Sequence, residues 1–509
     1  MTSAMRPIVI IGAGVGGLTA AALLAAAGED VVVCEAAATP GGKLRELTID
    51  GRQLDAGPTV FTMRWVFEAI FAAAGASLDD CLTLRPVTTL ARHAWGAHAR
   101  LDLFADIDAS ADAIGVFAGA AEATRFRAFT AEARRTYTTL EASFLDAPAT
   151  NPLGLTARIG LSRPGDLLSI RPFETLWRAL GGYFHDPRLR QLFGRYATYS
   201  GASPYLAPAT LMLIAHVENS GVWQVDGGMH RIARALETLA TRHGATFRYA
   251  APVAEIVVGR SGAEGVVLAS GERIDAAAVV VNADPQALAS GRFGPAASRA
   301  VAEMPARARS LSALTWTLVA ETSGFELSHH NVFFADDYRA EFDAIFGQQR
   351  LPATPSVYIC AEDRGDKPTG HKGERLHMIV NAPATADARS LTTREIDACE
   401  MATFAMLERS GLWVARTAAA TVRTTPADFA AMFPATGGAL YGRASHGWRA
   451  SFQRTGSKTR IPGLYLAGGA THPGAGVPMA ALSGRLAARA LLRDHALRMT
   501  TSARGSTGR

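Results

Sequence analysis

Residues 9–36 read VIIGAGVGGLTAAALLAAAGEDVVVCEA and carry the strongest structural signal in the chain. A short apolar run at 8–11 predicts a strand, the Ala- and Leu-rich run at 18–27 predicts a helix, and the Val-rich run at 30–34 predicts a second strand. An apolar N-terminal run after Arg6 is also typical of a secretory signal. Because a signal peptide has no use for glycines at this spacing, we interpret the stretch as a βαβ unit.

Four glycines and one acid in this unit have the spacing of a dinucleotide cradle. Gly12 allows a tight turn, Gly14 lets the backbone approach a pyrophosphate, and Gly17 lets the helix pack closely on the strand. The helix N-terminus then faces the anion. Glu35 ends the second strand, where a carboxylate accepts hydrogen bonds from ribose hydroxyls. We predict that these residues and Gly16 bind the cofactor of a protein that stays in the cytoplasm.

Composition and charge restrict the class of protein. The chain has 509 residues, of which 48% are hydrophobic and 19% charged, as in a globular protein of about two or three domains. Its formal net charge of +5 arises without a long basic run, so we expect no nucleic-acid partner. The four cysteines lie far apart, which argues against a zinc site and a disulfide framework. No run approaches the roughly 18 apolar residues that span a bilayer, so any membrane contact is expected to be peripheral.

The residues that follow Glu35 predict a second contact with the cofactor. A Gly-Gly turn precedes Lys43 and Arg45, which supply positive charge near the phosphates, and DAGPTVF at 55–61 returns the chain to the same site. Ordinary nicotinamide domains have no such extension, and it resembles the N-terminal signature of the flavin-containing amine-oxidase and carotenoid-desaturase superfamily. The residues expected to contact the cofactor here are Gly42, Lys43, Thr59 and Val60.

Two later segments are expected to complete the same domain. Residues 461–492 predict a strand, a glycine-rich loop and a helix that begins near residue 477 and aims its positive end at the flavin ring. Residues 221–256 predict a turn, an amphipathic helix and a strand whose backbone pairs with the adenine ring, and 271–285 predict a buried strand. The cofactor-binding residues expected in these segments are Val253, Asn282, Gly468, Gly469, Pro478 and Met479.

The chain as a whole resembles the bacterial carotenoid desaturases of the phytoene-desaturase type. The resemblance lies in VIIGAGVGGL, GGKLRELTIDGRQLDAGPTVF, YATYSGASPYLAPATL, VDGGMHRIA, VVVNADP and LYLAGGATHPGAGVPMAALSG, which are spread from residue 9 to residue 484. GGMHRIA and HPGAGVPMAALSG are similar to the branch that desaturates hydroxyneurosporene or methoxyneurosporene. Gly469 stands where many flavoenzymes have an acid for the ribityl chain, so backbone groups or water must replace that side chain.

The resemblance implies an α/β fold with a Rossmann-like FAD-binding domain of the amine-oxidase and phytoene-desaturase type. It also implies an antiparallel-sheet substrate domain and a helical lid that contacts the membrane. The discontinuous segments expected for the FAD-binding domain are 1–85, 223–290 and 455–497. The substrate domain is expected at 86–104 and 291–454, the lid at 105–222, and a disordered tail at 498–509.

The lid contains an arginine-rich stretch with an apolar side. Its arginines are expected to meet anionic lipid headgroups while the apolar side enters the interface. The alternative is a helix packed on its own protein, because amphipathic helices usually face a core. The resemblance favours peripheral contact with the inner membrane, since a long polyene is insoluble in water. The residues of the apolar side are Phe173, Leu176, Trp177, Leu180 and Phe184.

The resemblance implies that FAD removes two hydrogens from adjacent carbons of a linear C40 carotenoid, with 3,4-desaturation of 1-hydroxyneurosporene or its methoxy analogue expected. A quinone or oxygen would then reoxidise the flavin. The polyene itself delocalises the allylic cation left by hydride removal, so the protein's task is positioning and exclusion of water. Glu218 and His472 are candidate proton acceptors. The alternative for Glu218 is that it is simply solvated, and the alternative for His472 is a structural role in its loop. We assign no catalytic residue.

Three other activities stay open: phytoene desaturation, amine oxidation by FAD, and isomerisation of a carotenoid without net redox change. The GE pair typical of monoamine oxidases is missing from the C-terminal motif, which weakens the second of these. The absence of GxSxG and HExxH patterns leaves hydrolase functions without support. His329, His330, His371 and His377 are scattered without ligand-like spacing, so no metal site is expected.

Overall fold

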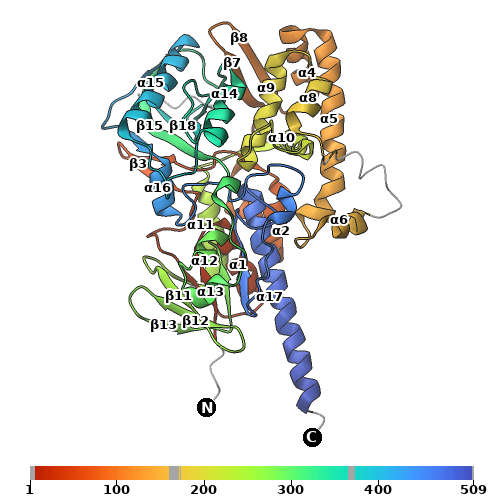
Figure 1. The fold of residues 1–509 in the computed structure, drawn as a ribbon, viewed down its shortest axis with the longest axis vertical. Helices are drawn as coiled ribbons and strands as arrows, with labels where there is room; N and C mark the ends of the chain where they lie inside the picture. The colour runs from red at the N-terminus through yellow and green to blue at the C-terminus, as the bar shows by residue number, and fades with distance from the viewer. Residues whose placement is uncertain (1–5, 160–170, 172, 365–372, 507–509) are drawn as a thin grey trace.

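The computed structural model describes residues 6–159, 171, 173–364 and 373–506. Figure 1 shows two lobes, with both chain termini at the same end of the molecule. The lobe nearer the termini contains the first βαβ unit and the last helix. The other lobe has a large sheet on one side and a group of helices on the other.

The lobe with the termini is built on a five-stranded parallel sheet. In sheet order its strands are β10 (Thr246–Arg248), β2 (Val31–Cys34), β1 (Ile8–Ile11), β14 (Ala278–Val281) and β21 (Leu464–Leu466). Val9 pairs with Val279 and Val281 pairs with Leu466, so segments from both ends and the middle of the chain share one sheet. The strands are almost wholly apolar because both faces of the sheet are covered. The prediction of a domain assembled from discontinuous segments is confirmed.

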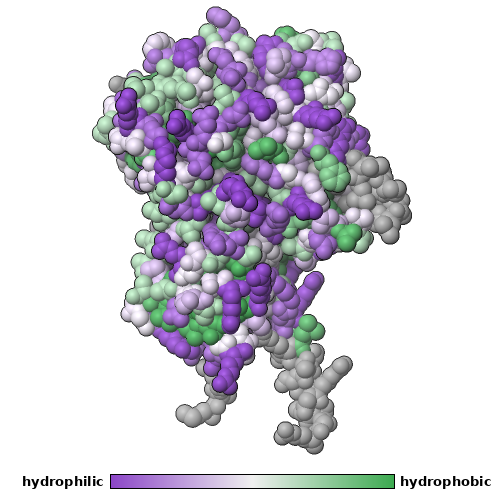
Figure 2. Space-filling view, viewed as in Figure 1, coloured by the Kyte–Doolittle hydropathy of each residue, from purple (hydrophilic) through white to green (hydrophobic). Residues whose placement is uncertain are grey.

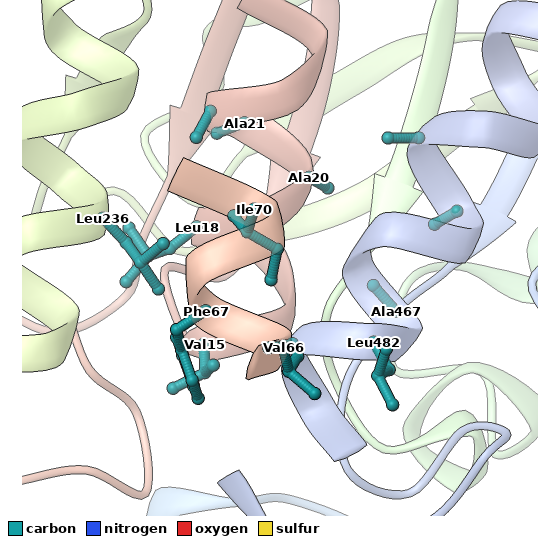
Figure 3. Packing of buried hydrophobic residues seen from close by; sticks show 14 of the residues in the cluster. Val15, Leu18, Ala20, Ala21, Val66, Phe67, Ile70, Leu236, Ala467 and Leu482 are labelled. Atoms are coloured by element: carbon teal, nitrogen blue, oxygen red, sulfur yellow. The ribbon is translucent and has the colours of Figure 1, made fainter. Parts of the chain in front are cut away.

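Four helices pack on one face of this sheet. They are α1 (Val15–Ala26), α2 (Arg64–Ala73), α11 (His230–Arg242) and α17 (Val477–Ser506). Figure 3 shows Leu18, Phe67 and Leu482 from three of them in one buried cluster. A Cβ on Gly484 of α17 would lie 2.1 Å from the carbonyl oxygen of Gly16 in α1, so the first and last helices touch through their backbones.

The other face of the parallel sheet is covered by a small antiparallel sheet and two short helices. These elements are β11 (Val253–Val258), β12 (Ala263–Leu268), β13 (Arg273–Asp275), α12 (Pro285–Ala289) and α13 (Pro295–Ser298). Val9 and Val279 point into this second core, which also contains Ile256 and Leu288. Both faces of the parallel sheet are therefore shielded from water.

The C-terminal tail differs from the prediction. A disordered segment was expected from Arg498, but α17 continues to Ser506 and projects beyond its lobe in Figure 1. Leu482 and Leu491 anchor the helix in the core. Because extending a formed helix costs far less than nucleating one, the anchored part supports the polar turns that follow.

The second lobe contains an eight-stranded sheet. Along the sheet the strands are β19 (Leu412–Ala415), β15 (Ser312–Gly324), β18 (Glu374–Ala382), β17 (Val357–Ala361), β16 (His330–Phe333), β7 (Thr89–Trp95) and β8 (Ala99–Phe104), with β20 (Thr421–Thr424) also on β15. The expected antiparallel sheet is confirmed here, because β18 pairs antiparallel with both β15 and β17. One pair, β16 with β7, is parallel, and it joins the hairpin formed by β7 and β8 to the sheet. Helices that belong to this lobe are α14 (Tyr338–Phe342), α15 (Thr393–Arg409) and α16 (Pro426–Met432).

The helical side of this lobe has its own hydrophobic core. Its helices are α4 (Ile107–Ala118), α5 (Ala120–Leu140), η1 (Glu141–Leu145), α6 (Pro152–Ile159), α8 (Leu176–Tyr183), α9 (Pro187–Gly194), η2 (Arg195–Ser200), η3 (Ala209–Met212) and α10 (Leu213–Asn219). Leu176, Leu180 and Phe184 are at most 2% exposed and pack in this core, so the prediction that they enter a membrane is wrong. An amphipathic helix usually buries its apolar face against the core of its own protein. Phe173 remains 79% exposed.

Smaller elements connect the two lobes. The strands are β3 (Glu46–Ile49) with β4 (Arg52–Asp55), and β5 (Phe61–Thr62), β9 (Val222–Val225) and β6 (Leu84–Pro86). The remaining short helices are α3 (Leu78–Cys81), η4 (Ala306–Ala308), η5 (Asp343–Gly347) and η6 (Ala450–Gln453). Among the described residues, no helix combines the length and apolar composition needed to cross a bilayer.

Candidate active site

The turn between β1 and α1 is packed against two distant segments of the chain. Asn282 Nδ2 donates a hydrogen bond to the carbonyl oxygen of Gly12 at 3.3 Å. A Cβ on Gly14 would lie 2.8 Å from Asn282 Nδ2, and one on Gly16 would lie 2.7 Å from the backbone nitrogen of Gly468. The structure therefore brings together the predicted residues Gly12, Gly14, Gly16, Gly17, Asn282 and Gly468.

The N-terminus of α1 is open toward this turn. Its N-cap residue, Gly14, makes no side-chain capping hydrogen bond. The first N–H groups of a helix have no intrahelical acceptors, and the aligned peptide dipoles add partial positive charge there. A pyrophosphate fits such an uncapped helix end.

Glu35 follows β2 and places its carboxylate at the same turn. Its Oε2 accepts a hydrogen bond from the N–H of Ala13 at 2.6 Å, and its Oε1 accepts one from Ala37 at 2.8 Å. The N–H of Ala251 donates to the carbonyl oxygen of Glu35, so the segment that leads to Val253 lies beside it. The arrangement fits a ribose at Glu35 with an adenine ring beyond it, and this nucleotide contact stays a prediction.

Two cations, the partly buried Lys43 and the buried Arg454, test whether a dinucleotide fits this site. Lys43 Nζ donates to the carbonyl oxygen of Leu440, and Arg454 Nη1 donates to that of Tyr441 at 3.0 Å. Burial lowers the pKa of Lys43 and lowers that of Arg454 to about 10. Asp284 attracts both charges, but neither cation forms an ion pair with a carboxylate in the described ranges. Buried charges are costly unless an anion neutralises them, so the pair fits a pyrophosphate and a reduced flavin.

The segment around Lys43 is held against the cradle. Gly41 forms a bridge with Gly14, and a Cβ on Gly42 would lie 3.2 Å from the Gly14 Cα. Thr59 Oγ1 lies 2.6 Å from the hydroxyl of Tyr358, and Val60 packs on the helical core. The predicted contacts thus extend from the N-terminus of α1 to the boundary between the lobes. They are Gly42, Lys43, Thr59 and Val60.

Arg45 does not join this group. Its Nε donates to the carbonyl oxygen of Ala56 at 2.9 Å, and its Nη2 donates to Thr424 Oγ1 at 2.9 Å. The guanidinium also lies over the ring of Phe429. Arg45 therefore ties the loop to the eight-stranded sheet, and Lys43 is the cation that the loop contributes near the open helix end.

The glycine-rich loop before α17 has the predicted form. It connects β21 to the helix that begins at Val477, and Arg454 Nη1 lies 3.4 Å from the carbonyl oxygen of Gly469. The side chain of Pro478 is buried and that of Met479 is partly exposed at the N-terminal end of α17. The loop thus lies beside Arg454, which joins the candidate site and which sequence reasoning missed because no local pattern marks it.

His472 in this loop has a structural role. Its Nε2 lies 3.1 Å from the carbonyl oxygen of Phe144 and 2.9 Å from that of Ala147, which makes Nε2–H the donor. Burial lowers the pKa of His472 to about 4. The ring joins the loop to η1 in its neutral form, which favours the structural alternative over proton acceptance.

Glu218 lies in a buried polar cluster. It is 7% exposed, its Oε2 accepts a hydrogen bond from Tyr196 at 2.7 Å, and its Oε1 accepts one from Tyr199 at 2.5 Å. The alternative that Glu218 is solvated is therefore wrong, and both oxygens already have donors. Sequence reasoning missed Tyr196, Tyr199 and their neighbour Arg195. The spacing of the tyrosines was a signal, because residues three apart eclipse each other on a 3-10 helix such as η2.

Two histidines that appeared scattered in the sequence meet a cysteine in the structure. His330 pairs with Cys360 across β16 and β17, and ligand atoms of His329, His330 and Cys360 lie within 4.8 Å of one another. The Nδ1 atoms are engaged, in His329 by the carbonyl oxygen of Arg364 and in His330 by the hydroxyl of Tyr358. His329 and Cys360 line a cavity of about 340 Å³. Side chains of these types can bind a divalent metal. The expectation of no metal stays a prediction, and His371 lies outside the described residues.

Comparisons with known proteins agree with this geometry. The model of the family described as flavin containing amine oxidoreductase matches residues 15–492. The chain is 52% identical to the hydroxyneurosporene desaturase of Rubrivivax gelatinosus, over 95% of this chain and 93% of the relative. It is 45% identical to the hydroxyneurosporene desaturase of Cereibacter sphaeroides, over 98% and 100%. Among solved structures, an oxidoreductase from Methanosarcina mazei has a TM-score of 0.58 at 18% identity, covering 94% of this chain and 99% of that one.

Proposed function

The chain belongs to the family of flavin containing amine oxidoreductases and uses FAD, and from this premise we propose that it is a carotenoid desaturase. Its substrate is a linear C40 carotenoid of the 1-hydroxyneurosporene or methoxyneurosporene type, and the bond introduced is C3=C4. The observation that carries this proposal is near full-length identity of 52% and 45% to two hydroxyneurosporene desaturases. Two cations without carboxylate partners among the described residues support the cofactor site.

The cofactor is held by the residues that converge on the α1 turn. The open helix end and Lys43 bind the pyrophosphate, Glu35 binds a ribose, and the backbone at Val253 contacts the adenine. The segments 1–85, 223–290 and 455–497 form the FAD-binding domain, while 86–104 and 291–454 form the substrate domain. The other cofactor contacts are Gly12, Gly14, Gly16, Gly17, Gly42, Thr59, Val60, Asn282, Gly468, Gly469, Pro478 and Met479.

The protein's contribution to the chemistry is charge compensation and positioning. Bound FAD supplies the hydride acceptor. Lys43 and Arg454 stabilise negative charge in a region shielded from water. The hydrophobic core of the helical side excludes water from the polyene, whose conjugation spreads positive charge along its own chain. Neither His472 nor Glu218 is arranged as a proton acceptor, so no catalytic residue is assigned.

Product spectra test the proposed function directly. Purified protein with FAD should convert 1-hydroxyneurosporene in vesicles into a product with one further conjugated double bond, seen as absorption at longer wavelength and a mass lower by two hydrogens. Simple amines should not be turned over. A product of unchanged mass would indicate isomerisation and contradict desaturation. Anaerobic assays with and without a quinone distinguish the two proposed electron acceptors, quinone and oxygen.

A surface patch supports contact with the cytoplasmic face of the inner membrane. Phe173 is 79% exposed and its ring centre lies 5.4 Å from that of Trp448, while Leu206, 48% exposed, accepts a backbone hydrogen bond from the residue before Trp448. Arg178 and Arg449 are exposed beside them. Aromatic side chains with arginines around them are typical of a membrane interface. On the face in Figure 2, hydrophilic and hydrophobic residues are interspersed.

Phe173→Asp should weaken vesicle binding at least about tenfold, because burial of one such side chain contributes roughly 1.5–3 kcal/mol. The measurement is co-sedimentation with vesicles that contain anionic phospholipid. Met401→Asp is the matched control, since Met401 is 66% exposed on α15 but lies outside the patch. Vesicle binding by Phe173→Asp at the wild-type level would contradict membrane contact at this patch.

A further inference from the structure

Three side chains that carry metal-binding atoms meet on two paired strands of the second lobe. His330 begins β16, His329 precedes it, and Cys360 lies on β17. One ligand atom from each of the three residues lies within 4.8 Å of the other two. The register of the sheet fixes this arrangement, because it pairs Cys360 directly with His330.

The thiol and one imidazole have the separation of two ligands on a single ion. Cys360 Sγ lies 3.7 Å from His329 Nε2. Zn–S bonds of about 2.3 Å and Zn–N bonds of about 2.0–2.1 Å at a tetrahedral angle place sulfur and nitrogen about 3.6 Å apart. The ring centres of His329 and His330 lie 4.5 Å apart, so the second imidazole is close enough to supply a third ligand after a side-chain adjustment.

Both imidazoles are oriented by a hydrogen bond at Nδ1. His329 Nδ1 lies 3.1 Å from the carbonyl oxygen of Arg364, which makes Nδ1–H the donor and leaves a lone pair on Nε2. His330 Nδ1 lies 2.7 Å from the hydroxyl of Tyr358, and that hydroxyl lies 2.6 Å from Thr59 Oγ1. Histidines that bind metals usually donate their other N–H to an oxygen in this way. The two rings therefore have the surroundings of metal ligands.

A cavity gives an ion access to this point. His329 and Cys360 line a cavity of about 340 Å³, which has room for a water molecule as a further ligand. Acidic side chains outnumber basic ones in its lining, which favours a cation over an anion. The acids are Asp55, Asp226, Glu362 and Asp363, and the bases are Arg85 and Arg375.

We propose that His329, His330 and Cys360 bind a zinc ion whose fourth coordination position faces the cavity. On binding, the thiol proton of Cys360 passes to solvent and the thiolate joins two neutral imidazoles on the metal. Thiolate and imidazole ligands favour zinc over magnesium or calcium, which prefer oxygen ligands. The inference departs from the expectation, drawn from the spacing of the histidines, that no metal is bound. It does not depend on the identity of the polyene.

Zinc binding to the protein with FAD tests the proposal. Tag-free protein is treated with a chelator and then dialysed against Zn²⁺. Elemental analysis should give about one zinc per chain, and X-ray absorption at the zinc edge should show one sulfur neighbour at about 2.3 Å among nitrogen and oxygen neighbours. The Tm should be higher with zinc than without it, because the ion binds the folded state.

Variants of two ligands identify the site. Cys360→Ser and His329→Gln should each lower the zinc affinity at least about 100-fold, since loss of a ligand costs more than loss of a group that orients one. Cys81→Ser is the matched control, because Cys81 is a free cysteine at the end of α3 and lies outside the cluster. It should bind zinc as the wild type does.

Absence of bound zinc would overturn the inference and leave a hydrogen bond from the thiol to His329 as the reason for the 3.7 Å contact. Zinc without a sulfur neighbour, or wild-type affinity in both variants, would also overturn it, as for an ion held by surface histidines. If Cys360→Ser loses its FAD or its folded circular dichroism spectrum, His329→Gln decides, because His329 is partly exposed. None of these measurements uses desaturation, so a failure of the proposed function leaves their outcome unaffected.

Discussion

Gly17→Ala is expected to remove FAD from the protein. A Cβ at this position would lie 2.1 Å from the carbonyl oxygen of Gly12 and 3.1 Å from Asn282 Cβ, so α1 would have to move away from the turn that we propose faces the pyrophosphate. Overpacking of this kind costs about 1–3 kcal/mol even where side chains yield, and here the obstacle is backbone. We expect the FAD affinity to fall at least about 100-fold.

The measurement is FAD content by visible absorbance, followed by titration of the apoprotein with FAD. Gly182→Ala is the matched control, because its added Cβ, in α8, meets nothing within 4 Å. If Gly17→Ala fails to fold by circular dichroism, Glu35→Gln tests the same site without adding a Cβ to the turn and should bind FAD about tenfold more weakly. Wild-type affinity in both variants would contradict the nucleotide site.

Lys43→Met is expected to raise the thermal stability of the apoprotein and to lower its affinity for FAD. Burial lowers the pKa of Lys43, which means that its charge is held at a cost, and it has no carboxylate partner within the described ranges. Removing the charge should therefore raise the Tm of the apoprotein. The same change removes a buried countercharge for the cofactor, so the FAD affinity should fall about 100-fold, as for loss of one charge-assisted contact.

Thermal unfolding with and without FAD measures both effects. Lys458→Met is the control, because Lys458 is 60% exposed and pairs with Asp494 at 2.6 Å away from the cradle. It should leave the FAD affinity unchanged. An apoprotein Tm that falls in Lys43→Met, together with wild-type FAD affinity, would show that Lys43 serves the loop through its bond to Leu440 and not the cofactor.

Much of the geometry around the α1 turn could be predicted because its signals are local. A turn such as Gly12 to Gly17 and an acid at the end of the next strand need only neighbouring residues to take their form. Three separated motifs of this kind also implied that their segments share one sheet, and β1, β14 and β21 do so. The family relation then extended these motifs to an activity.

Residues without a local pattern could not be predicted. Arg454 and Arg195 are ordinary arginines in the sequence. Only folding brings Arg454 to the carbonyl oxygen of Tyr441 and Arg195 to the hydroxyl of Tyr199. His330 and Cys360 likewise meet because β16 pairs with β17. Such contacts depend on the register between distant strands, which a single sequence does not display.

The sequence by itself determined the βαβ unit, the glycine turns and the relation to FAD-dependent desaturases. The tertiary structure decided which apolar faces are covered and which charges are left without partners. Leu176 and Leu180 turn inward while Phe173 stays outside, although all three follow one helical pattern. The physical reason is that hydrophobic spacing fixes which residues share a face, whereas burial of that face depends on what the rest of the chain packs against it.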